Sequence, residues 1–354
     1  MSSVKASNAV LAKARAKYGR RLTPKNYRDL AVLGSVSEVA AYLKSNTRFS
    51  EVLGNVKESM IHRDYLEKLV VDSNLKDIGQ LCRFEKSAGE NLYEYIVQKV
   101  EIDEIINFVR LLAAGIPEQY LLDFSGRVDE MSKIDFLKLA EVRSFKQLMT
   151  FMTKTRYRKV FHSFPSTVDG IPDVTMIEAA LDNLIFKDTS KLIKTGFSED
   201  TRKELEELLG VQAELLNLRR LYRGKKYYNV SSDLLRARMI DVHVHLSKIT
   251  MEKLINAVDE KEALEILKTT YYKKFLDKYN FENVDFFAAC VIEELCSRKI
   301  RMSVNPAVVM FCYVIFTEIE TENITNIIEG VRYEQSPEKI SEMLINVDRE
   351  GGSA

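Results

Sequence analysis

TEIETENITNIIEGVRY, residues 317–333, is the stretch whose pattern decides the fold class. Five branched apolar residues recur in it at helical spacing, which predicts a helix with one buried face: Ile319, Ile324, Ile327, Ile328 and Val331. Polar residues fill the other faces of the helix: Glu318, Glu320, Glu322, Asn323, Asn326 and Glu329. The glutamates at 318–322 are interpreted as a solvated helix face. Gly330 stands where the helix could end.

Two earlier stretches resemble this one. EIIN occupies residues 104–107, and ELLN occupies residues 214–217. The asparagines Asn107, Asn217 and Asn326 are separated by 110 and 109 residues. Amphipathic helices resemble one another, so this spacing alone would not establish a repeat.

A second landmark recurs at nearly the same period. YLKSNTRFSEVL (42–53), TFMTKTRYRKVF (150–161) and EILKTTYYKKFL (265–276) share a threonine with an aromatic residue two positions later. The threonines, Thr47, Thr155 and Thr270, lie 108 and 115 residues apart. Two landmarks in the same order predict three helical repeats of about 110 residues, over 1–125, 126–235 and 236–354. The aromatic residues are interpreted as core anchors and not as ligand contacts.

Composition places the chain among ordinary globular proteins. Of its 354 residues, 46% are hydrophobic and 29% are charged, and only six are proline. Lys+Arg and Asp+Glu balance at 52 each, so no global field attracts nucleic acid or an acidic membrane. The four cysteines lack metal-ligand spacing and suit a reduced, cytosolic chain: Cys82, Cys290, Cys296 and Cys312.

No stretch is expected to cross a membrane. The longest uncharged run, residues 302–317, has 16 residues, fewer than the roughly 20 that a spanning helix needs. Asn305 as N-cap and Pro306 at the first helical position indicate a buried helix. Residues 1–21 carry six basic groups and no acid, as a transit peptide would, but a first amphipathic helix over 10–18 is the preferred interpretation.

Helical periodicity continues along the whole chain, and strands do not alternate with helices. The sequence therefore predicts an all-α protein. Long helices are expected over 64–84, 91–114, 198–224, 283–297 and 305–330. Between them we expect shorter helices, among them 176–185, a Pro/Gly-rich link at 165–172 and a frayed end at 347–354.

One motif resembles a metal site. Asp241-Val242-His243-Val244-His245 resembles the first ligands of amidohydrolase barrels, which would make the chain a metal-dependent hydrolase. Such a site needs further downstream ligands, but the other histidines, His62 and His162, lie upstream. The motif is therefore interpreted as polar residues that end a helix before Ser247. Phosphate-binding and nucleophile-elbow motifs are absent too, so no catalytic residue, metal ligand or cofactor is predicted.

The basic run RRLYRGKKYY, residues 219–228, interleaves cations with aromatics. It could bind nucleic acid, which the zero net charge disfavours, or an acidic surface of a partner protein. Alternatively, its cations complement the dipole at a helix C-terminus. The candidate partner-binding residues are Arg220, Arg223, Lys225 and Lys226.

Three degenerate helical repeats with these landmarks resemble the family of V-type/A-type ATPase C subunits, to which the eukaryotic d subunit also belongs. The resemblance covers nearly the whole chain and rests on Thr47-Arg48-Phe49, Thr155-Arg156-Tyr157 and the closing segment 324–332. Tyr271 departs from it, because the first two copies have arginine there. The resemblance implies a funnel of three pseudo-symmetric helical domains.

The same resemblance implies a non-catalytic rotor subunit of the central stalk, without a cofactor. The wide end of the funnel would sit on the membrane proteolipid ring, on its cytoplasmic face, and its mouth would receive the shaft of subunits D and F. It would serve ATP-driven ion transport or ATP synthesis, without inserting into the membrane. The alternative is an α-helical repeat scaffold for another complex.

Overall fold

The structure is a computed structural model that describes residues 3–57, 61–89, 91–164 and 172–345. Throughout these ranges the chain forms helices joined by turns and loops, with no β-strand, which confirms the all-α class. The link expected at 165–172 lies outside the described residues except for its last residue, and the end at 347–354 lies wholly outside them.

The chain forms two compact units, residues 1–90 together with 293–354, and residues 91–292. Division into three segments at residues 125 and 235 stays a prediction. Both ends of the chain belong to the first unit, so its core is built from segments that lie far apart in sequence.

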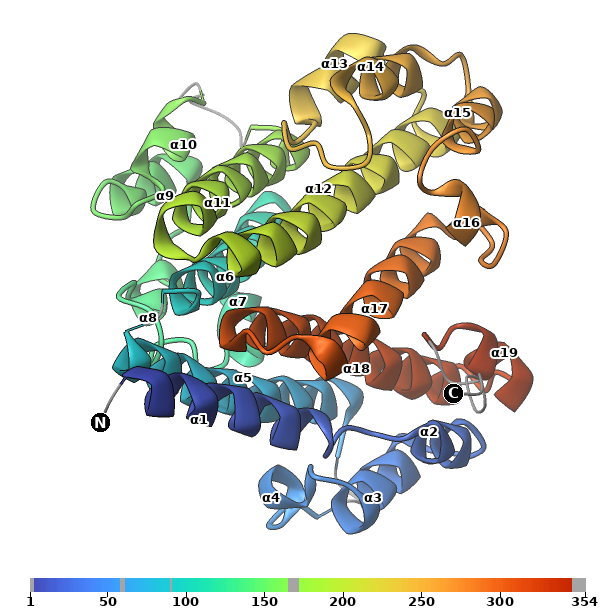
Figure 1. Ribbon diagram of the computed structural model, residues 1–354. Coiled ribbons are helices and arrows are strands. Elements are labelled where there is room, and N and C mark those ends of the chain that lie inside the picture. The colour runs from blue at the N-terminus through green and yellow to red at the C-terminus, as the bar shows by residue number, and fades with distance from the viewer. Residues whose placement is uncertain (1–2, 58–60, 90, 165–171, 346–354) are drawn as a thin grey trace. The chain divides into compact units, whose positions relative to one another are not determined.

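Three long helices form the centre of the first unit. They are α1 (Ser3–Tyr18), α5 (Arg63–Ala88) and α18 (Pro306–Arg332). Each packs against the other two, and Figure 1 shows them side by side. The short helices of this unit are α2 (Pro24–Ala31), α3 (Val36–Asn46), α4 (Ser50–Leu53) and α19 (Pro337–Glu342). Of these, α2, α3 and α19 pack directly on α18.

The apolar stripe predicted on α18 is buried, because Ile319, Ile324, Ile327, Ile328 and Val331 are all at most 5% exposed. Four of the five lie in one core cluster that also includes apolar residues from 22–70. Two polar residues of α18 are buried as well: Glu320 is 0% exposed and Asn323 is 1% exposed. The expectation that Glu320 lies on a solvated face was therefore wrong.

The second unit contains more short helices. Its long helices are α6 (Tyr93–Ala113), α11 (Val174–Gly196), α12 (Glu199–Tyr227) and α17 (Val284–Met302), the last of which ends in the first unit. Its short helices are η2 (Pro117–Gln119), α7 (Tyr120–Asp123), α8 (Phe136–Leu139), α9 (Phe145–Met152), α10 (Arg158–His162), α13 (Ser232–Arg238), α14 (Lys248–Asn256), α15 (Glu260–Leu267) and α16 (Lys273–Leu276). The helices α6 and α12 both pack on α11, and α13 and α15 pack on α12.

Helix α11 is more than twice as long as the predicted helix at 176–185. It begins where the Asp173 carboxylate accepts the backbone N–H of Thr175 at 2.9 Å. It continues to Gly196, with Thr189 and Ile193 extending its buried face. The polar residues of 187–195 contain no helix breaker, and they masked the apolar period on which the prediction relied.

The three repeated threonines make the same local contacts. The hydroxyls of Thr47, Thr155 and Thr270 donate to backbone carbonyls three or four residues earlier, at 2.5, 2.9 and 2.7 Å. Each hydroxyl also accepts the backbone N–H two residues later, at 3.2 Å in all three turns. The aromatic residues at that later position, Phe49, Tyr157 and Tyr272, are 0% exposed, which confirms them as core anchors.

Candidate functional site

A buried carboxylate lies behind the third threonine turn. Glu214 of α12 is 0% exposed, and its Oε1 atom accepts the three consecutive backbone N–H groups of residues 244–246 at 2.8, 2.7 and 2.7 Å. Its Oε2 atom accepts the hydroxyl of Tyr272 at 2.7 Å. Burial raises the pKa of Tyr272 well above its usual value, and the neighbouring Glu214 raises it further. The cluster fastens the loop before α14 and the turn before α16 to one point of α12.

The second threonine turn has a matching cluster. Glu101 of α6, 2% exposed, accepts the hydroxyl of Tyr157 at 2.7 Å and that of Ser132 at 2.7 Å. The guanidinium of Arg156 lies 3.5 Å from the same carboxylate. Burial raises the pKa of Tyr157, with Glu101 adding to the effect. This cluster therefore joins α6 to the segments that precede α8 and α10.

In the first unit the first threonine turn has Phe49 at the position of Tyr157 and Tyr272. Phe49 has no hydroxyl, and the preceding residue, Arg48, forms the ion pair with Glu320 of α18. The other oxygen of Glu320 accepts the backbone N–H of Leu22 at 2.7 Å. Burial opposes a charge on Arg48, but the pKa of this residue is nevertheless raised because Glu320 lies beside it. The contacts explain why Glu320 is buried in place of facing solvent.

The asparagines of α12 and α18 show which positions correspond. Asn217 donates to the carbonyl of Ile240 at 2.9 Å and accepts its N–H at 2.8 Å. Asn323 makes the same pair of bonds to Ile345, at 3.1 and 2.8 Å. By these contacts the counterpart of Asn217 is Asn323, and not Asn326, which the residue spacing had indicated. Two asparagines one helical turn apart share a face, so spacing alone could not distinguish them.

The basic run at the end of α12 is largely engaged inside the second unit. Arg220 forms an ion pair with Asp182 of α11 and donates to the carbonyl of Arg238 at 2.6 Å. Burial lowers the pKa of Arg220, with Asp182 opposing that effect. This residue ties α12 to α11 and to the end of α13, which is a structural role.

Lys225 also serves the fold. Its ammonium donates to the carbonyls of Ile255, at 2.9 Å, and Ala257, where it caps the C-terminus of α14. Lys225 therefore complements the dipole of α14 and not the dipole of α12, the helix to which it belongs. Lys226 donates to the hydroxyl of Tyr222 at 2.8 Å.

Arg223 is the most exposed of the four candidate residues. Half of its side chain (51%) meets solvent, and its guanidinium pairs with Asp285. The two tyrosines that end the run, Tyr227 and Tyr228, are 61% and 75% exposed. Partner binding at Arg220, Arg223, Lys225 and Lys226 stays a prediction, and the exposed end of the run is the part that a partner could reach.

The two histidines of residues 241–245 have separate surroundings. The motif lies in the loop between α13 and α14, so the expectation that it ends a helix was wrong; α13 already stops at Arg238. The imidazole of His243 lies 3.1 Å from Asp241, whereas the ring of His245 stacks on Tyr271 with centroids 3.5 Å apart. Burial lowers the pKa of His245. Within the described ranges, no group of three or more His, Cys, Asp or Glu side chains could hold a metal ion.

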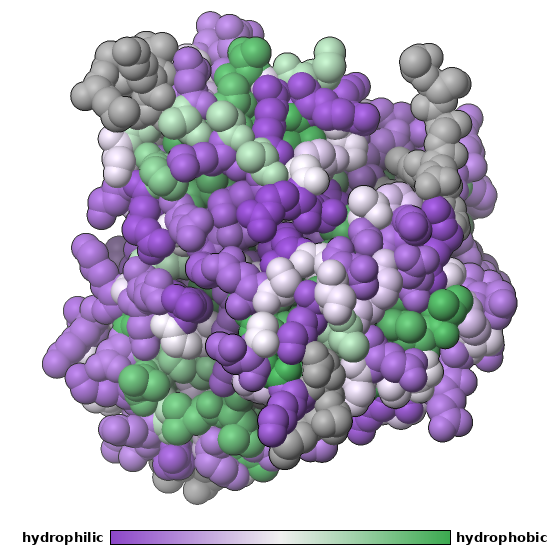
Figure 2. Space-filling model, turned by 90° about the horizontal axis from the view of Figure 1, so that it is seen from below, coloured by the Kyte–Doolittle hydropathy of each residue, from purple (hydrophilic) through white to green (hydrophobic). Residues whose placement is uncertain are grey.

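The helices of the described residues were compared with the length and hydropathy of a membrane-spanning helix. Over the part of the chain that the structure describes, no helix is long and apolar enough to cross a bilayer. The face drawn in Figure 2 is mostly hydrophilic, and its hydrophobic residues gather in a few separate patches.

Comparison with known families and proteins gives a match over most of the chain. Residues 10–343 match the family described as ATP synthase (C/AC39) subunit. The C subunit of the A-type ATP synthase of Methanocaldococcus jannaschii is 22% identical, over 96% of this chain and 86% of that protein. The protein of the same name from Methanobrevibacter smithii is 23% identical, over 94% and 86%. That from Methanosphaera stadtmanae is 22% identical, over 74% and 65%.

Proposed function

The chain belongs to the ATP synthase (C/AC39) subunit family, and from this premise we propose that it is the non-catalytic central-stalk rotor subunit of an A/V-type ATP synthase. In this role it joins the shaft of subunits D and F to the membrane proteolipid ring. It transmits torque between them, for ion transport or for ATP synthesis. It docks at the cytoplasmic face through protein contacts with the ring.

The family match over residues 10–343 carries the proposal, and the buried carboxylates give it a physical basis. A part that transmits torque must resist shear between its helices. Charge-assisted hydrogen bonds to Glu101, Glu214 and Glu320 fasten short helices and loops to long helices at three points. Directional bonds of this kind fix one arrangement, whereas apolar packing alone tolerates sliding.

Arg223, which is exposed, and Lys226, which is half-buried, are the proposed contacts for an acidic partner. Arg223 and Lys226 can be changed without removing the internal bonds of Arg220 and Lys225. Charges at the rim of an interface mainly steer association and set its salt dependence. A lower rate of association at raised salt is therefore expected, with a smaller effect on dissociation.

The test is reconstitution with purified D–F shaft and purified proteolipid ring. We expect the chain to bind each separately, to bridge them, and to hydrolyse no nucleotide on its own. The double variant Arg223→Glu with Lys226→Glu should slow association with the partner at the basic run about tenfold at low salt. Arg158→Glu with Lys159→Glu, two exposed cations of α10, serves as the matched control.

Failure to bind either the shaft or the ring would overturn the rotor proposal. If the chain bridges them but the Arg223/Lys226 variant associates as fast as the control, the rotor proposal stands and the basic run is a solvated helix end. The two outcomes separate the role of the subunit from the assignment of this surface.

A further inference from the structure

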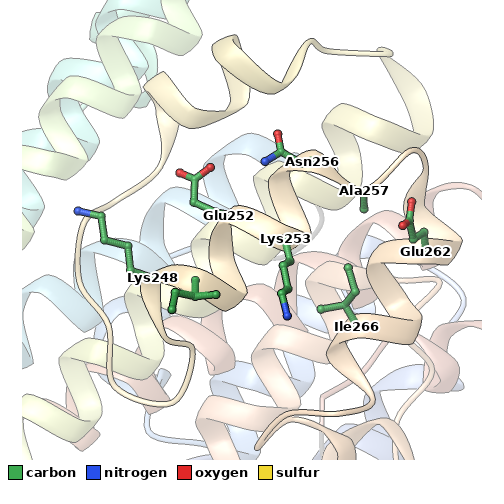
Figure 3. A pocket seen from close by; sticks show the side chains of 8 residues that line it. Lys248, Glu252, Lys253, Asn256, Ala257, Glu262 and Ile266 are labelled. Atoms are coloured by element: carbon green, nitrogen blue, oxygen red, sulfur yellow. The ribbon is translucent and has the colours of Figure 1, made fainter.

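An open groove lies between α14 and α15 in the second unit. It has a volume of about 580 Å³, and its lining includes Ile249, Lys253, Ala257 and Ile266 (Figure 3). Ile249 is 72% exposed, and Val258, in the turn between the two helices, is 89% exposed. Ile249 in the lining and Val258, the residue after the lining residue Ala257, therefore give the groove and its edge an exposed apolar component.

Helices α2 and α3 of the first unit offer an internal comparison. Both helix pairs, α2–α3 in the first unit and α14–α15 in the second, follow a buried leucine. The backbone N–H of Leu22 and that of Leu246 each donate to a buried glutamate at 2.7 Å. The next residue, Thr23 or Ser247, is the N-cap of the first helix in each pair. The first helices can therefore be aligned on their caps.

The second helices align in the same way. Ser35 and Asp259 cap α3 and α15 with their side chains. A glutamate stands three residues after each cap and accepts the backbone N–H of the residue that precedes the cap. Glu38 accepts from Gly34 at 2.8 Å, and Glu262 accepts from Val258 at 2.6 Å. The two helix pairs thus share their capping at both starts.

The aligned positions differ where the two helices of each pair face one another. Between α2 and α3, the hydroxyl of Tyr42 donates to Asp29 at 2.8 Å and accepts from Asn26 at 3.1 Å. Counted from the caps, Ile266 stands in place of Tyr42, and Lys253 stands in place of Asp29. An isoleucine and a lysine cannot form that bridge, so the space that Tyr42 spans in the first pair is left open in the second.

The charges around the groove favour an acidic ligand. Glu252 is held by Arg236 through hydrogen bonds of 3.0–3.1 Å, and Glu262 is engaged in capping. Lys253 is exposed and forms no ion pair with a carboxylate among the residues described. The ammonium of Lys248, 76% exposed, lies 4.0 Å from Asp241, at the limit of an ion pair. Two accessible cations therefore flank the apolar surface.

We propose that the α14–α15 groove is a docking site for an amphipathic helix of another subunit of the complex. Apolar residues of that helix lie against Ile249, Val258 and Ile266, and carboxylates beside its apolar stripe pair with Lys248 and Lys253. A groove between two helices with cations at its rim fits this mode of recognition. The inference rests on the proposed function, because that function names the complex whose subunits include the partner.

Site-specific photo-crosslinking in the assembled complex tests the proposal. A photoreactive amino acid at Val258 should crosslink to a helical segment of another subunit that carries carboxylates beside its apolar residues, as mass spectrometry of the product would show. The matched control is the same amino acid at Val32, which is 66% exposed at the end of α2, in the helix pair that Tyr42 bridges. We expect little crosslinking there.

Two variants test the chemistry of the groove. Lys253→Glu should lower the crosslinking yield at Val258 about tenfold, because like charges then face each other, whereas Lys159→Glu should leave the yield unchanged. The triple change Thr250→Asn, Lys253→Asp and Ile266→Tyr reproduces the bridge of the first pair. It should abolish the crosslink while leaving the helix content measured by circular dichroism unchanged.

Crosslinking at Val258 no stronger than at Val32, or only to lipid, to a second copy of the chain or to a non-helical segment, would overturn the inference. If the complex contains the chain but Val258 stays uncrosslinked, the inference alone fails. If the complex excludes the chain, the proposed function fails as well.

Discussion

Removing the hydroxyl of Tyr272 tests how much the hydrogen bonds to the buried carboxylate of Glu214 contribute to the free energy of unfolding. Tyr272→Phe deletes the O–H that donates to Glu214 at 2.7 Å and changes nothing else in a site that is 0% exposed. A hydrogen bond to a charged group contributes about 1.5–3 kcal/mol. Glu214 keeps its three backbone donors, so we expect a loss near the middle of that range, about 2 kcal/mol.

Tyr157→Phe should cost more than Tyr272→Phe. Glu101 is left with the hydroxyl of Ser132 at 2.7 Å and with Arg156 at 3.5 Å, and so keeps fewer close donors than Glu214. We expect a loss of about 2–3 kcal/mol, because a buried carboxylate with fewer donors bears more of its desolvation cost.

Phe49→Tyr is the reciprocal control. Glu320 already accepts from Leu22 and Arg48, and Phe49 is fully enclosed, so an added hydroxyl finds no room. We expect destabilisation of about 1 kcal/mol or more from overpacking, and no gain from the new donor.

Urea unfolding followed by far-UV circular dichroism measures these differences as shifts of the midpoint at constant slope. Values for Tyr272→Phe and Tyr157→Phe within about 0.5 kcal/mol of the parent, the range of neutral surface changes, would refute the anchoring role. A stabilising Phe49→Tyr would refute the claim that Glu320 is already satisfied.

Four further substitutions probe the second unit and α18. The pKa of His245 is lowered in the folded chain, so its neutral form stabilises the fold. The free energy of unfolding should be retained above the unfolded pKa near 6.5 and should fall as pH drops through the folded pKa. His245→Asn should flatten this pH dependence in urea titrations from pH 7.5 to 5. Gly210→Ala places a Cβ only 2.0 Å from the side chain of Val244 and should lower the unfolding free energy by about 1–3 kcal/mol; an unchanged melting temperature would contradict this. Asn217→Ala leaves two buried backbone groups unpaired and should cost at least about 2 kcal/mol, whereas Asn326→Ala, which loses one bond of 3.3 Å, should cost less; equal losses would contradict the assignment of corresponding positions.

Much of the fold is readable from the sequence, because periodicity and capping are local. The apolar stripe of α18, its start after Asn305 and the turns at Thr47, Thr155 and Thr270 all follow from residue types at fixed spacings. These features depend on neighbours within a few positions. The length of α11 was missed because its second half is rich in lysine and hydroxyl residues, which hide the period.

The buried carboxylates could not be predicted in the same way. Glu320 looks like any glutamate of a solvated helix face until its partners are known, and one of them, Leu22, lies 298 residues away in sequence. A weak signal existed: Glu214 and Glu320 both stand three residues before an asparagine, and Glu101 stands three before Glu104. The internal contacts of Arg220 and Lys225 could not be predicted either, because their acceptors are distant in sequence or are backbone atoms.

The union of both chain ends in one core has a consequence for biosynthesis. Arg48 is separated from Glu320 by 272 residues, and Leu22 by 298, so the ribosome must make most of the protein before these bonds can form. At roughly 5–20 residues per second, that interval lasts about 15–60 s. Residues 91–292, in contrast, leave the ribosome as one continuous unit and can fold first. During that interval the apolar faces of α2 and α3 lack their native partner on α18, so we expect this part of the nascent chain to need a chaperone.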